Sequence, residues 1–104
     1  MLYVMLSADL SSAEKQRYDF NLKLKGEGFN KLANVDTVWA KSLEGYHNKE
    51  GLVASGLKQL LKKFAIELEI PKLTYVVQIG NNAPLGVIIE DYRGTYRVED
   101  FDPA

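Results

Sequence analysis

The 104-residue sequence contains no cysteine, one histidine, one tryptophan and three prolines. Without cysteine, neither a disulfide framework nor a thiolate metal site is available. The histidine, His47, stands beside Tyr46 and Asn48 in an expected loop, and with no second histidine we interpret it as a loop residue rather than an acid or base. No apolar run approaches the roughly 20 residues that span a bilayer, and no signal-peptide pattern opens the chain. We therefore expect a cytoplasmic protein with no membrane partner.

The chain also lacks a strong charge of either sign. Lys and Arg total 13 against 14 Asp and Glu, so the formal net charge is -1. This balance excludes a global field that draws the protein to polyanions, and any nucleic-acid contact has to be local. The content of 46% apolar and 26% charged residues is typical of a globular protein. We expect a single domain over residues 1–101 and a frayed tail at 102–104.

Alternating and helical patterns follow one another along the chain. Strands are expected at 2–8, 29–33, 37–43, 72–79, 86–91 and 95–101. A capping box at Ser11 to Glu14 predicts a helix that ends near Glu27. Asn48 is the expected cap of a second helix, which ends before Pro71 and carries a wide apolar stripe that includes Leu57, Leu61 and Phe64.

This order predicts an α+β fold of the ferredoxin-like, split βαβ kind, β-α-β-β-α-β, with extra strands at the C-terminus. In that pattern both helices lie on one face of an antiparallel sheet and the other face is bare. We expect the bare face to carry some of the side chains of Tyr3, Met5, Trp39, Tyr75 and Val77. A monomer rarely leaves so much contiguous apolar surface in water, so a covering is expected.

Three coverings are open at this point. The C-terminal strands can fold back over the face, a second copy of the chain can pack sheet to sheet, or single-stranded nucleic acid can stack on the aromatic side chains. In the second case the interface residues are Tyr3, Met5, Trp39 and Tyr75.

The N-terminal stretch contains a strand that ends in Asp9, a polar helix start with Lys15 and Arg17, the pair Gly28-Phe29 and the strand Thr37-Val38-Trp39. Over roughly the first 40 residues this pattern resembles the small CRISPR-associated spacer-acquisition nuclease family and its GhoS-type antitoxin endoribonuclease relatives. The resemblance implies a ferredoxin-like homodimer whose sheets pack together, often with a C-terminal strand added to the partner's sheet. It also implies that Asp9, at the end of the first strand, lies near the dimer axis and binds a metal.

On this interpretation Asp9 is the catalytic and metal-binding residue, and it would hold Mg²⁺ or Mn²⁺ if a twofold axis brings its copy within reach. The alternative is that Asp9 has no catalytic role and is a carboxylate stabilised near the positive end of a helix. The candidate phosphate contacts to RNA or DNA are Lys15, Arg17, Lys23 and Lys25, although Glu14, Asp19 and Glu27 are interleaved with them as on an ordinary solvated surface.

Three functional hypotheses follow, and the third is small-molecule binding on the bare sheet face. The first is a homodimeric nucleic-acid-associated protein, either a metal-dependent endonuclease or an antitoxin endoribonuclease. The second is a non-catalytic protein-interaction or regulatory module, toxin-neutralising or phage-type, that binds a protein partner through the sheet face and the C-terminal strands.

Overall fold

The computed structural model describes residues 1–11, 14–34 and 37–103. Over these residues the chain is an α+β protein with the element order βαββαβββ. The elements are β1 (Leu2–Ser11), α1 (Glu14–Gly26), β2 (Asn30–Lys31), β3 (Val38–Leu43), α2 (Glu50–Glu67), β4 (Lys72–Ile79), β5 (Leu85–Tyr92) and β6 (Thr95–Phe101). Neither of the two described helices is long and apolar enough to cross a membrane.

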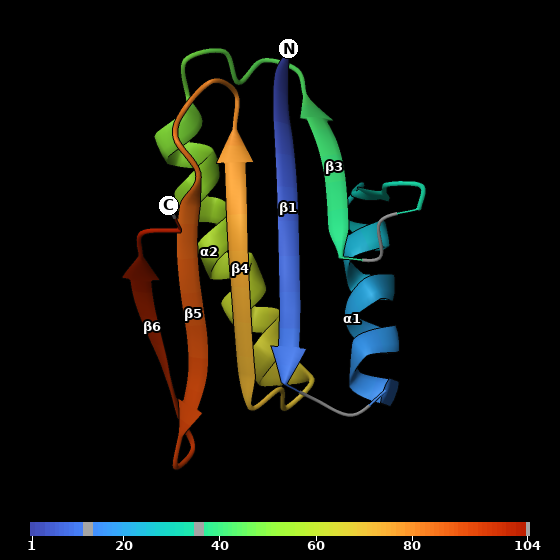
Figure 1. The fold of residues 1–104 in the computed structure, drawn as a ribbon, viewed down its shortest axis with the longest axis vertical. Helices are drawn as coiled ribbons and strands as arrows, with labels where there is room; N and C mark the ends of the chain where they lie inside the picture. Colours follow the sequence, from blue (N-terminus) through green and yellow to red (C-terminus); the bar gives the residue numbers. More distant parts are fainter. Residues whose placement is uncertain (12–13, 35–36, 104) are drawn as a thin grey trace.

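The strands form one antiparallel sheet in the order β2-β3-β1-β4-β5-β6. Figure 1 shows this sheet face-on, with both helices behind it. The order of the first four strands is compatible with the split βαβ pattern that the sequence predicts. The predicted interior position of β4 is confirmed, because this strand lies between β1 and β5.

The core lies between the sheet and the helices. In β1 the alternation is strict: Leu2, Val4, Leu6, Ala8 and Leu10 are buried, as period-2 strand geometry requires when one face is covered. α1 contributes Phe20 and Leu24, and the Phe20 ring meets the edge of Phe64 from α2 at a centroid distance of 6.3 Å. Both helices therefore cover the same face.

Trp39, Tyr75 and Val77 lie on the covered face, and the prediction that they line the bare face is wrong. Their exposed fractions are 2%, 1% and 2%. Trp39 and Val77 stand opposite Leu6, and Tyr75 opposite Ala8, so they share the buried side of β1. Burying these bulky side chains removes more apolar surface from water than burying the neighbouring Val and Ala residues would.

The covered position next to Trp39 on β3 belongs to Lys41, which stays half-buried at the edge of the core. Its ammonium group lies over the Phe29 ring, 5.5 Å from the ring centroid, and donates to the Glu27 carbonyl. A lysine can occupy such an edge position because its stem packs while its charge finds an acceptor. The alternation of β3 was therefore predicted correctly, but its two sides were assigned to the wrong faces.

The C-terminal strands extend the sheet. β5 pairs with β4, and β6 pairs with β5 through a tight turn at Arg93 and Gly94, both with positive φ. The Gly94 amide donates to the Asp91 carboxylate at 2.7 Å. The first of the three predicted coverings, in which these strands fold back over the bare face, is therefore wrong.

The N-terminal ends of both helices differ from the capping that the sequence predicts. Ser11 closes β1, and the rest of the predicted capping box, Ser12 and Ala13, lies outside the described residues. Asn48 does not cap α2: it has a positive φ of 62° in the preceding turn, and the N-cap position belongs to Lys49, without a side-chain hydrogen bond. The predicted end of α1 is confirmed to within one residue, since the helix ends at Gly26.

Candidate interaction surface on the open sheet face

The open face is the side of the sheet turned toward the viewer in Figure 1, away from the helices. Strand register places one row of residues across it from β3 to β6: Val38, Ser7, Val76, Gly86 and Phe101. Ala40 and Met5 stand opposite each other in the next row toward the N-terminal end of β1. Ile88 stands opposite Thr74, in the next row toward the C-terminal end of β1.

These rows form an apolar band across the middle of the open face. We define the band as Met5, Val38, Ala40, Val76, Ile88 and Phe101, all of them exposed or half-buried. Tyr3 extends it toward the N-terminal end of β1, with 66% of its surface exposed against 48% for Met5. Of the predicted interface residues, the structure therefore places Tyr3 and Met5 on this face and Trp39 and Tyr75 on the other.

Phe101 is held in the band by a glycine. A Cβ atom built on Gly86 would lie 2.6 Å from the Phe101 ring, so the ring rests directly on the glycine backbone. Covering a strand glycine with a cross-strand aromatic ring stabilises the pairing of the two strands. The band thus reaches the sixth strand of the sheet.

The lower end of the open face in Figure 1 is charged. Glu90 stands opposite Lys72 on one side and Arg97 on the other. Arg97 also lies over the Tyr92 ring, 4.4 Å from its centroid. A hydrogen bond between the Tyr92 hydroxyl and Glu90, together with the negative charge of Glu90, raises the pKa of Tyr92. Opposite charges therefore face each other within the chain at this end.

Asp9 is exposed on the open face at the same end, opposite Thr74. Mg²⁺ and Mn²⁺ favour several oxygen ligands, with more than one carboxylate in most protein sites. No group of three or more His, Cys, Asp or Glu residues within the described ranges is placed to hold a metal ion. The residues described in one chain do not fit a Mg²⁺ or Mn²⁺ site, and the metal role of Asp9 stays a prediction that depends on a second chain.

The four candidate phosphate contacts all belong to α1, on the covered side of the sheet, whereas Asp9 is exposed on the open face. Lys15 pairs with Asp19 at 3.4 Å, and Lys23 pairs with Glu67 at 2.8 Å and lies over the Phe64 ring. Arg17 donates to the Leu10 carbonyl at 3.4 Å and lines a hollow of about 330 Å³ with Asn21 and Lys31. Lys25 is exposed in the last turn.

Sequence reasoning missed most of the apolar band. Val76 and Val77 are adjacent valines, and the run from Tyr75 to Val77 is apolar on both sides, so its pattern does not indicate which residue faces the helices. Ile88 and Phe101 were missed because the C-terminal strands were not placed in the same sheet plane. The one available signal was Gly86, since a glycine inside a strand often marks a close approach by another group.

No family model, curated protein or solved structure matches the chain. The resemblance of the N-terminal stretch to the CRISPR-associated nucleases and their antitoxin relatives therefore stays a prediction.

Proposed function

We propose that this protein is a ferredoxin-like, non-catalytic interaction module whose open sheet face packs against a second copy of the chain. The ferredoxin-like assignment is supported by the antiparallel order β2-β3-β1-β4, with α1 and α2 as crossovers on one face. The observation that carries the proposal is the apolar band left uncovered by every described element.

The composition of the open face supports a protein partner. Each of five strands contributes at least one apolar residue to the band, with the uncharged polar residues Ser7, Thr74 and Gln78 among them and a charged margin at one end. An apolar centre with a polar margin is the usual anatomy of a protein interface. Exposed apolar patches of this kind mark interaction sites on soluble proteins.

The charges favour a second copy over nucleic acid. The described charged residues of the open-face rows are two cations, Lys72 and Arg97, and three anions, Asp9, Glu90 and Glu99. A nucleic-acid surface needs an excess of Lys and Arg to replace counterions. A nearly neutral surface of mixed sign can instead pack against its own copy across a twofold axis without net repulsion.

The extents of the molecule set an upper limit on the area of the open face. The longer extents of the molecule are 38 Å and 27 Å, and Figure 1 views it along the shortest axis. Their product limits the footprint of the face to about 1,000 Å². A standard stable interface buries about 800 Å² on each partner. A sheet-to-sheet dimer therefore has to use most of the open face.

The edges of the sheet are less suitable for binding. β2 has two residues, and β6 carries Arg97, Glu99 and Asp100 along its length. Short or charged edge strands discourage the addition of a further strand. These features favour contact through the face.

Sedimentation equilibrium of Met5→Lys and Tyr18→Lys tests the proposal. Met5 lies in the band, and Tyr18 is a matched exposed residue of α1 with 64% exposure. We expect a wild-type dimer, a dissociation constant about 30-fold higher or more in Met5→Lys, and no change in Tyr18→Lys. A monomeric wild type, or equal effects of the two variants, would contradict the proposal.

The same runs with RNA, DNA and Mg²⁺ test the nucleic-acid hypothesis. The proposal predicts no change in mass with any of the three. If RNA or DNA binds and Asp9→Asn abolishes cleavage while the dimer persists, the nuclease prediction replaces the interaction module.

A further inference from the structure

A cavity of about 600 Å³ lies between α2 and the C-terminal part of the sheet, on the side opposite the open face. Where α2 borders it, the first lining residues, Gly51, Ala54 and Ser55, have side chains no larger than serine, and Lys58 follows one turn later. Val77, Leu85 and Val87 supply apolar walls from the sheet. This volume is within the range of small-molecule sites in proteins.

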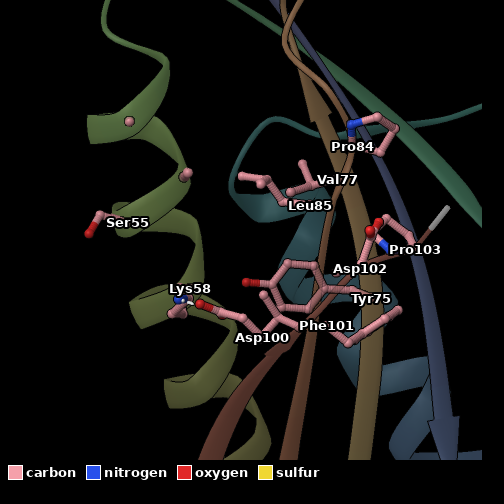
Figure 2. Close-up of a pocket in the computed structure, with 14 residues that line it drawn as sticks. Ser55, Lys58, Tyr75, Val77, Pro84, Leu85, Asp100, Phe101, Asp102 and Pro103 are labelled. Carbon is pink, nitrogen blue, oxygen red and sulfur yellow. Dashed lines mark hydrogen bonds and ion pairs between the residues drawn. The ribbon is translucent and has the colours of Figure 1, made fainter.

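Tyr75 lines this cavity, and its hydroxyl has no hydrogen-bond partner among the described residues. Figure 2 shows the Tyr75 side chain extending from the sheet toward α2, with its hydroxyl beside Lys58 and Asp100. The residue is 1% exposed, and its hydroxyl makes no hydrogen bond to another residue of the described chain. Leaving a buried hydroxyl unsatisfied is unfavourable, so such a group on a cavity wall indicates a missing polar partner.

Tyr96 provides the contrast on the same covered side of the sheet. Its half-buried hydroxyl donates to the Ile70 carbonyl at 3.0 Å. The fold therefore satisfies one tyrosine hydroxyl internally and leaves the other facing a cavity.

The charges beside the Tyr75 hydroxyl favour a cation. Lys58 and Asp100 form an ion pair at 2.8 Å between α2 and β6, and Asp102 adds a second acid to the cavity lining. Burial is the larger cause of the raised pKa of Tyr75, and the negative charge of Asp100 adds to it. Lys58, Asp100 and Asp102 together give the cavity lining a negative excess of one charge. A protonated amine is stabilised by such an excess, whereas a carboxylate is repelled.

We propose that this cavity binds a small organic amine with an apolar body. The ammonium group donates hydrogen bonds to the Tyr75 hydroxyl oxygen and to the Asp100 carboxylate, and the apolar body packs against Val77, Leu85 and Val87. Most of this site lies on the helix side of the sheet, and it borders the proposed dimer interface at Gly86 and Phe101, which line the cavity as well.

Titrations monitored by ¹H–¹⁵N NMR test the choice of ligand. The probes are tryptamine, indole-3-propionate and tryptophol, which share an indole and differ in head group. We expect shifts around the cavity with tryptamine at millimolar concentration, as about 12 heavy atoms allow, and weaker shifts with the other two. Equal binding of all three, or binding of none, would overturn the proposal.

Two variants locate the binding. Tyr75→Phe removes one hydroxyl and should weaken tryptamine binding about 10-fold. Asp100→Asn should also weaken the binding. Tyr96→Phe is the matched control and should leave the affinity unchanged. Full affinity in Tyr75→Phe would overturn the proposed contact.

Thermal unfolding without ligand gives a second, independent readout. Because the Tyr75 hydroxyl has no partner, Tyr75→Phe should raise Tm by about 4 °C, whereas Tyr96→Phe should lower it. A lowered Tm in both variants would show that the Tyr75 hydroxyl is already satisfied in the free protein, and the site would be overturned. Neither outcome depends on the dimer.

Discussion

Val4 and Tyr3 are adjacent in β1, yet Val4 is 2% exposed and Tyr3 is 66% exposed. The same contrast separates buried Val77 from half-exposed Val76 on β4. Val76 and Val77 are chemically identical, and only their surroundings differ. The position of the helices determines which side is the core, and the other side stays open to solvent.

The largest expected effect is a difference in stability between a variant of the covered face and a variant of the open face. Trp39→Ala removes a fully packed ring beneath the helices and should lower the free energy of unfolding by about 3–5 kcal/mol. Tyr3→Ala, on the open face, should change it by less than about 0.5 kcal/mol at concentrations where the protein is monomeric. Urea unfolding followed by circular dichroism measures both. Comparable losses in the two variants would contradict the assignment of faces.

A second prediction compares two glycines. Gly86→Ala places a methyl group against the Phe101 ring and should cost about 1 kcal/mol or more, because the ring has to leave its place in the band. Gly56→Ala, in α2 with nothing within 4 Å of the added Cβ atom, should gain about 0.5–1 kcal/mol from helix propensity. The urea midpoints of both variants test this difference. A change in stability of the same sign in both variants would contradict the prediction.

A third prediction concerns alkaline pH. The pKa of Tyr75 is raised in the folded protein from an ordinary value near 10, so the folded state holds this proton after the unfolded chain has released it. The contribution to stability is therefore complete below pH 10 and is lost as the pH rises further. Tyr75→Phe should make the decline above pH 10 shallower, by up to about 1.4 kcal/mol per pH unit.

Urea unfolding at pH 9, 10 and 11 measures this difference. Tyr92 and Tyr96 also have raised pKa values, so a decline should persist in the Tyr75→Phe variant. Identical pH profiles for wild type and variant would contradict burial of the Tyr75 hydroxyl.

Much of the fold follows from the sequence because local patterns determine it. Alternation in β1 and the stripe of Leu57, Leu61 and Phe64 in α2 are visible in the residues and are confirmed by burial. The faces of β3 and β4 could not be assigned in the same way. Each strand is apolar on both sides near Trp39 or Tyr75, and only long-range packing selects the buried side.

The candidate sites were harder to predict than the elements. The apolar band depends on register across five strands, which brings Val38 and Phe101 into one row although they are far apart in the sequence. The cavity depends on small residues of α2 that line it together with Tyr75, and no short sequence motif predicts this arrangement. Asp9 was found by resemblance, and the structure leaves it at the charged end of the open face.

The central claim, that a second copy covers the open face, is tested most directly by isotope-filtered NMR on a mixture of ¹³C-labelled and unlabelled protein. The account predicts intermolecular NOEs from the methyl groups of Met5, Val38 and Val76. Intermolecular NOEs from Leu52 and Ile66 of α2 in their place, or none at a concentration where sedimentation shows a dimer, would contradict it.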